Sequence, residues 1–502
     1  MFTMGLLGGA LVLALLWLLF FSRLSRRARG LAAILLLAAT SAALVFFRFR
    51  GFSGDLIPLV ELRKAAPLPA SAPASFSPQE KNTPALPETT ANIPSAEVSL
   101  TAPPKSTAHK RAPYFNYPQF LGPQRNGNVA GIKLARDWKA QPPRLLWRKP
   151  VGTGWSAFAV FNDRAITQEQ HGEHERVRCY ELATGKLRWL HRDSTRYESP
   201  IAGNGPRATP TIAHERVYTV GATGKLNCLA LSSGERLWSQ DILRDNEAAM
   251  NEWGVSCSPL VLDSLVIVSA GGTQGKSLVA YHAMTGARIW SAGDDRASYS
   301  SPLLATLAGT PQILIFNRAK IVAHAPASGE MLWEQSWPNE TQCVAQPVAL
   351  PEDRVFATTG YGVGCKLFQI SRDEQRLWRS TLVWETTHLK AKFANVVVRE
   401  GFVYGLDDGI LVCLDLGNGL RKWKRGRYGH GQLVLIDDLL LIQAESGEVF
   451  LVEANPNAHV ELGGIAALEG KTWNNPALAA PFLLVRNDRE AACYELALAR
   501  PL

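Results

Sequence analysis

Three short stretches of the sequence contain residue types that could do chemistry. Residues 270–277 (AGGTQGKS) follow the apolar run LVIVSA and nearly match a phosphate-binding loop, with Ala270 where the first glycine belongs. Residues 171–174 (HGEH) could supply three metal ligands from two imidazoles and a carboxylate. Residues 152–157 (GTGWSA) form a glycine loop of the kind that lets a backbone approach a dinucleotide.

The residues around each stretch argue against that chemistry. A phosphate-binding loop must open a helix whose N-terminus holds the phosphates, but residues 277–286 (SLVAYHAMTG) continue as a strand. No helix holds the two imidazoles of residues 171–174 on one face, so we interpret this stretch as a hairpin tip. The glycine loop has no helix after it. We therefore expect no nucleotide and no metal site, and sequence spacing identifies no catalytic residue.

Seven cysteines are present, at positions 179, 228, 257, 343, 365, 413 and 493. Their odd number and the absence of a C-x-x-C pair argue against a disulfide framework. Cys179, Cys228, Cys413 and Cys493 lie in similar apolar strand contexts, so we expect them to be buried as small hydrophobic side chains.

The net charge of the 502 residues is +9, but the basic residues are concentrated at the N-terminus. Residues 1–50 hold six Arg and no acidic residue, which leaves 47 basic and 44 acidic groups in the rest. This balance provides no footprint for nucleic acid. The composition, with 46% hydrophobic and 19% charged residues, also excludes a disordered chain.

Two apolar runs in residues 1–50 predict a membrane anchor of two helices, about 4–21 and 31–47. Four Arg lie between them, which places the connection in the cytoplasm and both termini on the other side of a bacterial inner membrane. The remainder is then expected in the periplasm or on the outer face. A cleaved signal peptide is the alternative, but nothing basic precedes Arg23.

Residues 51–112 are predicted to be a linker. Nine Pro occur within residues 66–112, together with Ala, Ser and Thr and almost no aromatic residue. Such a composition cannot bury enough apolar surface to offset its ordering entropy, so we expect an extended tether.

A strand, turn and strand unit recurs from residue 145 to the end. Five copies place a glycine four residues before a tryptophan: Gly185/Trp189, Gly234/Trp238, Gly286/Trp290, Gly329/Trp333 and Gly419/Trp423. A sixth copy keeps Trp378 but has Glu374 in place of the glycine, and Trp147 precedes the series. Successive tryptophans are 42 to 52 residues apart, which is the period of propeller blades.

The spacing has a physical reason, because a hairpin that closes with a left-handed residue favours Gly at that point. A second marker, a polar residue and usually a Pro, begins the first strand of each unit. Eight strand starts follow from these markers, near Trp155, Thr209, Ser258, Ser301, Gln346, Asn395, Gln432 and Asn475. The predicted fold of residues 113–502 is therefore an all-β, eight-bladed propeller of four-stranded blades. Residues 145–150 (LLWRKP) should complete the last blade and close the ring.

These repeats resemble the pyrroloquinoline-quinone-like β-propeller family, in which an A/S-x-T-G-x-x-x-W element recurs in each blade. The resemblance covers about residues 115–502 and includes YPQFLGPQRNG (117–127) and GPRATPTI (205–212). It implies the fold but not the activity, because quinone-dependent dehydrogenases and a non-enzymatic lipoprotein of outer-membrane β-barrel assembly share this propeller.

The dehydrogenase branch implies a quinone cofactor beside a calcium ion and a ring formed by two adjacent cysteines. No adjacent cysteine pair occurs here, so pyrroloquinoline quinone with calcium is disfavoured. The lipoprotein branch implies a lipidated N-terminal cysteine, whereas the first cysteine here is Cys179. If the funnel of the propeller binds a cofactor, the candidate residues are Trp155, Arg207, Trp253 and Asn395.

Our leading hypothesis is a membrane-anchored, exported propeller that acts without catalysis as a scaffold or docking subunit for other envelope proteins. The alternatives are a quinone-dependent alcohol or sugar dehydrogenase that passes electrons to the membrane and a sensor that binds a small molecule in the funnel.

Overall fold

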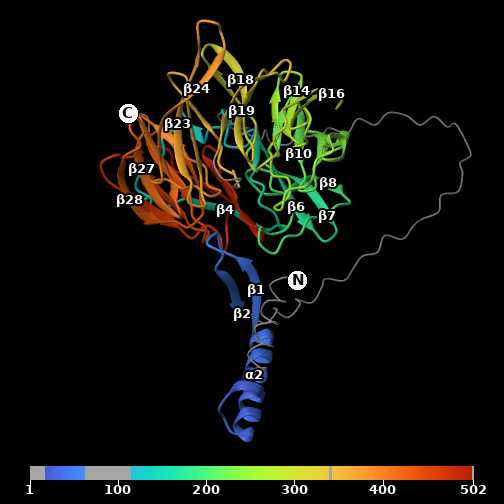
Figure 1. The fold of residues 1–502 in the computed structure, drawn as a ribbon, viewed down its shortest axis with the longest axis vertical. Coiled ribbons are helices and arrows are strands. Elements are labelled where there is room, and N and C mark those ends of the chain that lie inside the picture. Colours follow the sequence, from blue (N-terminus) through green and yellow to red (C-terminus); the bar gives the residue numbers. More distant parts are fainter. Residues whose placement is uncertain (1–16, 63–114, 338–341, 500–502) are drawn as a thin grey trace, which may run out of the picture. The chain divides into compact units, whose positions relative to one another are not determined.

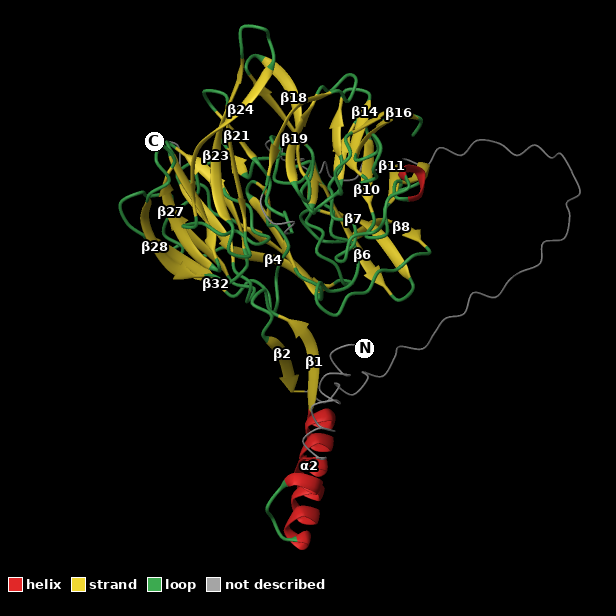
Figure 2. Ribbon diagram, in the orientation of Figure 1, coloured by secondary structure: helices red, strands yellow, loops and turns green. Residues whose placement is uncertain are grey.

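The structure is a computed structural model that describes residues 17–62, 115–337 and 342–499. The chain divides into two compact units. One contains Pro113–Leu502 together with the short segment Gly51–Ile57, and the other contains Phe2–Arg50 and Pro58–Ala112. In the first unit, eight antiparallel sheets are arranged as a ring of blades (Figures 1 and 2). The predicted eight-bladed propeller is confirmed.

Within each of the first seven blades, the strands follow the chain from the centre of the ring to its rim, and the last strand of blade 8 comes from elsewhere in the chain. Blades 1 to 4 consist of β5 (Ala159–Phe161), β6 (Arg164–His171), β7 (His174–Glu181), β8 (Leu187–Asp193); β9 (Thr211–Ala213), β10 (Arg216–Val220), β11 (Lys225–Ala230), β12 (Arg236–Asp241); β13 (Leu260–Leu262), β14 (Leu265–Ser269), β15 (Leu278–His282), β16 (Arg288–Ala292); and β17 (Leu303–Leu307), β18 (Thr310–Phe316), β19 (Lys320–His324), β20 (Met331–Ser336). Blades 5 to 8 consist of β21 (Val348–Leu350), β22 (Arg354–Thr359), β23 (Gly364–Arg372), β24 (Trp378–Thr386); β25 (Val397–Arg399), β26 (Phe402–Asp407), β27 (Ile410–Asp415), β28 (Arg421–Arg427); β29 (Gln432–Ile436), β30 (Leu439–Gln443), β31 (Val449–Glu453), β32 (Glu461–Ile465); and β33 (Ala477–Ala479), β34 (Phe482–Arg486), β35 (Glu490–Glu495) with β4 (Arg144–Pro150).

The ring closes as the sequence predicts. Strand β4, which precedes blade 1 in the chain, pairs antiparallel with β35 as the outer strand of blade 8, with Trp147 opposite Cys493. A further short strand, β3 (Asn128–Val129), pairs parallel with β29 at the inner edge of blade 7. Closure leaves no blade as the open end of the array, so no blade face lacks a neighbour.

The repeated glycine and tryptophan join neighbouring blades. The motif glycines have positive φ, as in Gly185 (67°) and Gly286 (73°), which confirms the predicted left-handed turn. Each also lies against the tryptophan of the preceding blade, since a Cβ on Gly286 would stand 2.8 Å from the ring of Trp238. The indole of that tryptophan donates to the carbonyl of Ala283 in the next blade, at 2.9 Å. Glycine therefore provides both the turn and the space for the ring.

The motif tryptophans of blades 3 and 4 differ in what they contact. Trp290 follows the pattern, because its ring lies against Gly329 of blade 4 and its indole donates to the carbonyl of Pro326 at 3.1 Å. Trp333 departs from the pattern, because its indole donates to the side-chain oxygen of Gln312 within its own blade, at 2.7 Å. The next blade in the ring has no motif glycine. Both tryptophans thus occupy the same position of the repeat, but their contacts depend on the blade that follows.

Trp423 of blade 6 keeps the hydrogen bond of the pattern but not the glycine. Its indole donates at 3.0 Å to the carbonyl of Asn455, between β31 and β32 of blade 7. The motif glycine of other blades lies three residues after this acceptor, and here that position is Ala458. The imidazole of His459 faces the indole of Trp423 edge-on, with ring centroids 5.8 Å apart. The contact between blades 6 and 7 thus differs from the glycine contact that joins other blades.

Blade 5 departs further from the sequence interpretation. Trp384, not Trp378, lies against the next motif glycine, Gly419, and donates to the carbonyl of Leu416 at 2.9 Å. The β23–β24 hairpin is longer than its equivalents, with Trp378 near its end beneath the guanidinium of Arg372. Because the hairpin is longer, Trp378 lies outside the position that contacts the next blade, although its place in the sequence matches the repeat. This blade also lacks the motif glycine.

The structure also tests the predictions for the cysteines and for two loops. All seven cysteines are buried, which confirms the prediction for the four strand cysteines. Residues 171–174 form the tip of the β6–β7 hairpin, with His171 opposite His174. Residues 270–277 connect β14 to β15, so the phosphate-loop resemblance leads into a strand and not into a helix.

The second unit contains a helix and part of a hairpin. Its described elements are a short π-helix (Trp17–Phe21), α2 (Arg26–Phe46) and β2 (Pro58–Leu62), which pairs with β1 (Phe47–Phe52). The predicted span 4–21 lies largely outside the described residues, and the predicted span 31–47 falls on α2. No helix in the described part of the chain is long and apolar enough to cross a membrane. The structure therefore does not support the two predicted spans.

The predicted linker of residues 51–112 begins differently in the structure. Gly51–Ile57 belongs to the compact unit of the propeller, and the strands on either side of it pair with each other. The nine Pro that motivated the prediction all lie beyond residue 66, so composition says little about the start of the segment. Residues 63–112 lie outside the described part.

Candidate functional site

A cavity of about 470 Å³ lies at one end of the channel through the propeller. Its wall includes all four residues predicted for the funnel, Trp155, Arg207, Trp253 and Asn395. They come from blades 1, 2, 3 and 6, so the ring brings together residues that are up to 240 positions apart in the sequence. Their role as ligands of a cofactor remains a prediction.

The tryptophans of the repeat are not part of this cavity. Trp290, Trp333 and Trp423 lie in the outer strands β16, β20 and β28, and none of the three lines the cavity wall. Trp155 and Trp253, which do line it, precede inner strands. The motif tryptophans therefore serve packing, and the cavity is lined by a different position of the repeat.

One position of the repeat recurs around this wall. The residue four positions before the inner strand of a blade points into the mouth of the channel in seven of the eight blades, and its equivalent in blade 7 lies beside them. We call this set the mouth ring: Trp155, Arg207, Ser256, Tyr299, Val344, Phe393, His430 and Trp473. The prediction named only Trp155 and Arg207 of these residues, because it did not compare the same position in every blade. The strand-start markers at fixed intervals were the signal that could have found the whole set.

In every blade except blade 1, a polar strand-start residue lies two residues after the mouth-ring position, and several of these residues are hydrogen-bonded from one blade to the next. The backbone N–H of Thr209 donates to the hydroxyl of Ser258 at 2.9 Å, and the N–H of Ser258 donates to that of Ser301 at 2.9 Å. The relay continues from Ser301 to Gln346 and from Gln346 to Asn395. The amide oxygen of Asn395 is thus engaged in holding two blades together, which is a structural role for a predicted ligand.

Aromatic rings give the cavity flat apolar walls. Trp253 stacks on Tyr299 with ring centroids 4.8 Å apart and an interplanar angle of 22°. Trp155 lies 4.9 Å from Trp473. The indole of Trp155 also donates to the carbonyl of Ala202 at 2.6 Å, which fixes its orientation.

Two cations of the cavity region lack a carboxylate at ion-pair distance among the described residues. The guanidinium of Arg207 lies 4.4 Å from the ring of Tyr197 and donates to the carbonyl of Gly203 at 2.7 Å. Burial lowers the pKa of Arg207 to about 10, so it stays charged at neutral pH. The ammonium of Lys471 lies 4.2 Å from the ring of Trp473, and burial lowers its pKa as well. The mouth is therefore suited to groups that bring negative charge or carbonyl oxygens.

The chain that leads into the propeller also contributes to the cavity wall. Phe120 of this segment lines the cavity. Arg125, only 2% exposed, donates to the backbone carbonyls of Ser258 at 2.9 Å, Pro259 at 3.0 Å and Pro302 at 3.1 Å. This segment is thus bound to the residues that lead into the inner strands of blades 3 and 4.

The cavity residues only partly fit the quinone and calcium implied by the dehydrogenase branch. The stacked aromatic rings and the guanidinium of Arg207 are groups that could bind a planar anion such as the quinone. For calcium the donor set does not fit, because the carboxylates in the wall are Asp55 and Glu252, and Asp55 is bonded to His430 and Lys392. In the described parts of the chain no three His, Cys, Asp or Glu side chains are grouped so that they could hold a metal ion. We derive no reaction step through this pair of groups.

Comparison with known proteins identifies the family of this repeat. A family model described as outer membrane protein assembly factor BamB matches residues 173–425, which run from the hairpin of blade 1 to the outer strand of blade 6. The chain belongs to this family. Membership confirms the resemblance to pyrroloquinoline-quinone-like propeller repeats.

Individual relatives are distant from this member of the BamB family. Outer membrane protein assembly factor BamB of Shewanella oneidensis is 27% identical over 218 residues, which are 42% of this chain and 50% of the relative. The match thus spans about half the length of the curated relative.

Solved structures agree on the fold alone. BamB from Moraxella catarrhalis superposes with a TM-score of 0.53 and 14% identity, over 72% of this chain and 99% of that one. Quinohemoprotein alcohol dehydrogenase from Comamonas testosteroni superposes with a TM-score of 0.55 and 12% identity, over 77% and 82%. Because enzymes and an assembly factor share the architecture, the site and not the fold must indicate the function.

Proposed function

We propose that this protein is a scaffold or docking subunit that binds other proteins of the cell envelope and catalyses no reaction. The observation that carries the proposal is the family match over residues 173–425 to an outer membrane protein assembly factor. The same match supports a propeller that works in the periplasm or at the outer membrane.

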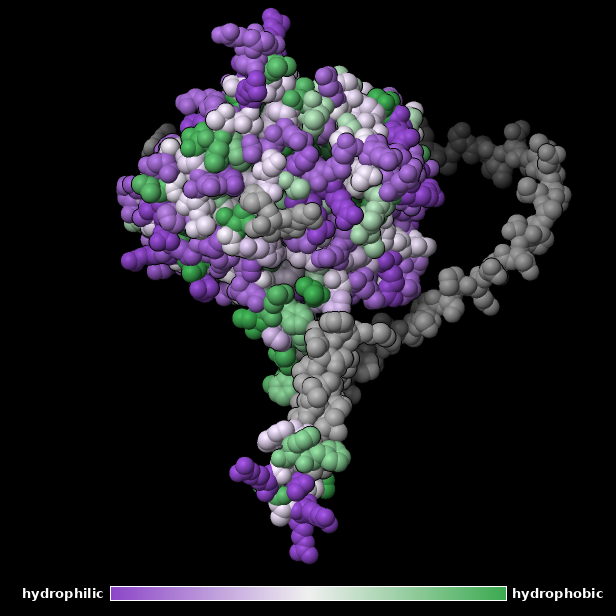
Figure 3. All heavy atoms as spheres, viewed as in Figure 1, coloured by the Kyte–Doolittle hydropathy of each residue, from purple (hydrophilic) through white to green (hydrophobic). Residues whose placement is uncertain are grey.

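The rim of the propeller provides surfaces for such binding. Blades expose an apolar side chain shortly before the motif tryptophan, as Leu237 (44% exposed) and Leu382 (45%) show. Blade 5 adds Leu377 (58%) and Val383 (48%) on its longer hairpin, which projects beyond its neighbours (Figure 1). In the view of Figure 3, apolar patches of this kind lie separately within a mainly hydrophilic surface. Exposed apolar side chains on a rigid sheet are typical anchors of protein interfaces.

Site-specific photo-cross-linking in cells tests the scaffold. A photoreactive residue at Leu382 of the full-length chain should yield one discrete adduct with an envelope protein, and the same residue at Leu237 should not. Leu237 is matched in exposure but belongs to a hairpin of ordinary length. Identical adduct patterns at both positions, or none at Leu382, would contradict binding through blade 5.

A titration separates the scaffold from the dehydrogenase. The full-length chain should show no saturable change in tryptophan fluorescence with micromolar pyrroloquinoline quinone and calcium, and no dye reduction with alcohols or sugars. Binding without turnover would favour the small-molecule sensor, for which the 470 Å³ cavity is the supporting observation. Binding with turnover would overturn the scaffold proposal.

Anchoring in the inner membrane, with both termini outside, belongs to the same proposal. Its support is the uncharged run 4–21 and the arginines that follow it. The full-length chain should then remain in the membrane pellet after alkaline carbonate extraction, and a variant without residues 1–50 should be released. Release of both the full-length chain and this variant would contradict the membrane anchor.

A further inference from the structure

The mouth of the channel holds a short segment of the same chain. Residues 51–57 comprise the end of β1 and the turn that leads to β2, and they belong to the compact unit of the propeller. We call this segment the mouth turn. It is closed internally by the N–H of Leu56, which donates to the carbonyl of Ser53 at 2.9 Å, and by the N–H of Ile57, which donates to the hydroxyl of Ser53 at 3.2 Å. Ser53 to Leu56 also line the cavity.

Loops of three blades bind the mouth turn through its backbone. The N–H of Gly54 donates to the carboxylate of Glu445 at 2.7 Å, and the carbonyl of Gly54 accepts from Lys392 at 3.1 Å. Lys471 donates to the carbonyl of Phe52 at 3.2 Å. Because the N–H and the carbonyl of the same residue are both bound, the site recognises the backbone conformation of the turn as well as its charge.

The side chain of Asp55 is bound as well. One oxygen of its carboxylate lies 2.9 Å from Nε2 of His430 and 3.4 Å from the ammonium of Lys392. The hydrogen bond with His430 lowers the pKa of Asp55, so the carboxylate is charged at neutral pH. A buried imidazole and an ammonium thus face one acidic side chain.

The site admits no side chain at the residue before this Asp. Gly54 is buried, and a Cβ added to it would stand 2.2 Å from Cδ2 of His430. Its φ is not positive, so the requirement for glycine comes from the imidazole and not from the backbone conformation. The mouth therefore selects the sequence Gly-Asp within a turn.

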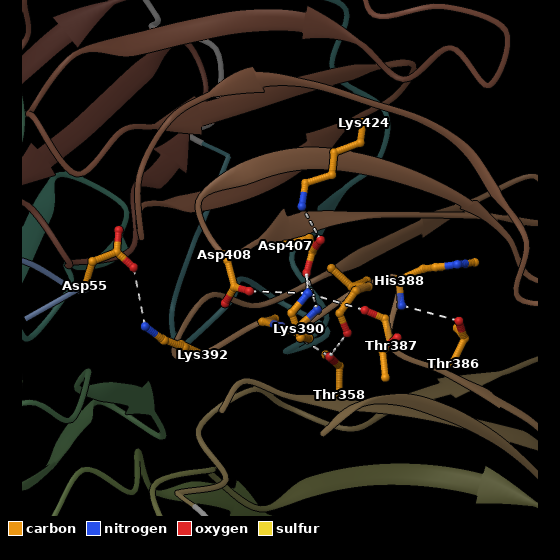
Figure 4. Close-up of polar contacts among 12 residues, drawn as sticks. Asp55, Thr358, Thr386, Thr387, His388, Lys390, Lys392, Asp407, Asp408 and Lys424 are labelled. Carbon is orange, nitrogen blue, oxygen red and sulfur yellow. Dashed lines mark hydrogen bonds and ion pairs between the residues drawn. The ribbon is translucent and has the colours of Figure 1, made fainter. Parts of the chain in front are cut away.

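The propeller also binds some of these groups directly. Glu445 accepts from the backbone N–H of His430 at 3.0 Å and from the indole of Trp473 at 2.8 Å. Lys390, two residues before Lys392, is bonded to Asp407 and Asp408 of blade 6, as Figure 4 shows. In the described part of the chain, the carboxylate paired with Lys392 is that of the mouth turn.

We propose that the mouth of the channel is a peptide-binding site for an acidic Gly-Asp turn, and that residues 51–57 occupy this site in cis. The occupant forms part of the cavity wall, so a competing peptide must displace it. The proposal stands without the scaffold function, because the occupant is part of the same chain.

Lysine labelling of the full-length chain, followed by mass spectrometry, tests the occupancy. In Gly54→Ala the new methyl group should expel the turn, and acetylation of Lys392 and Lys471 should become several-fold faster than in the wild type. Lys390 provides the internal control, because its partners belong to blade 6. Gly30→Ala is the matched variant, because a Cβ there meets nothing within 4 Å. Unchanged labelling of both lysines in Gly54→Ala would overturn the proposal.

A synthetic peptide with the sequence of residues 50–58 (RGFSGDLIP) tests recognition. It should restore protection of Lys392 and Lys471 in Gly54→Ala at concentrations that leave the wild type unchanged, and a peptide with Asn in place of Asp should protect less. Protection that does not depend on this Asp, or none, would overturn the assignment of a Gly-Asp site. If Gly54→Ala does not fold, Asp55→Asn provides the second variant, in which faster labelling is expected at Lys392.

Discussion

Glu175 is a carboxyl group that folding removes almost completely from water. Only 5% of the residue is exposed, and its carboxylate accepts from the N–H of Ala222 at 3.1 Å. Burial raises the pKa of Glu175 to about 7, Asp193 adds to the increase, and the Ala222 N–H and Arg207 oppose it. The native state therefore binds this proton more tightly than the unfolded chain.

The sign of the pH dependence follows from this increase. Between the ordinary carboxyl pKa, near 4.5, and about 7, the native state holds more protons, so the contribution of Glu175 to stability falls as the pH rises. Glu175→Gln removes the titration, and at pH 8 it should raise the free energy of unfolding by up to about 3 kcal/mol. Denaturant unfolding from pH 5 to 8 measures this. Glu173→Gln, at the exposed hairpin tip, should show no such gain, and an equal gain in both variants would contradict the assignment.

At this scale the sequence predicts which residues line the site but not what they contact. Trp155 and Arg207 could be placed because each precedes an inner strand by a fixed number of residues. Glu445 and Lys471 could not, because they lie in loops between strands whose length and path the repeat does not determine. The mouth turn was also missed, since a seven-residue segment outside the repeat carries no periodic signal.

The hairpin is the element in which the repeat can be tested most directly. Gly286 has a φ of 73° and lies against Trp238, whereas Gly275 has a φ of 77° and nothing within 4 Å of an added Cβ. Gly275→Ala should cost about 1–2 kcal/mol, the penalty of a left-handed residue with a side chain. Gly286→Ala should cost about 2–5 kcal/mol, because overpacking against the indole is added. Denaturant unfolding measures the free energy of unfolding of the two variants. Equal decreases would contradict a contribution from the tryptophan contact.

Eight blades, their strand starts and the closing strand could all be predicted, because each depends on a local pattern that recurs about every 45 residues. The contacts of individual tryptophans could not, because each depends on the blade that follows. Trp333 and Trp423 precede blades 5 and 7, neither of which has the motif glycine, and their partners differ accordingly. Trp378 lies six residues before Trp384, and only the contact with Gly419 distinguishes the one that joins the blades. The spacing of the repeat alone cannot show where extra residues have been inserted within one blade.

At the scale of the whole ring, closure depends on contacts between opposite ends of the chain. Arg486 of blade 8 is completely buried and donates to the hydroxyl of Thr167 at 2.7 Å and to the carbonyl of Gly152 at 3.0 Å, both in or near blade 1. A guanidinium that satisfies so many backbone and hydroxyl acceptors ties the last blade to the first. The joint between blades 8 and 1 should therefore be as strong as any joint within the ring.

Two matched tryptophans test this equivalence. Trp147 belongs to the closing strand, is 8% exposed and donates to the carbonyl of Leu182 at 2.8 Å. Trp189 joins blades 1 and 2, is 7% exposed and donates to the carbonyl of Leu231 at 2.9 Å. In a closed ring each substitution by Ala should cost about 3–5 kcal/mol, and the two losses should agree within about 1 kcal/mol. Unfolding followed by circular dichroism and by fluorescence should give coincident transitions in both variants. A much smaller loss in Trp147→Ala, or a separate early transition, would mean that the ring opens at this joint before the blades unfold.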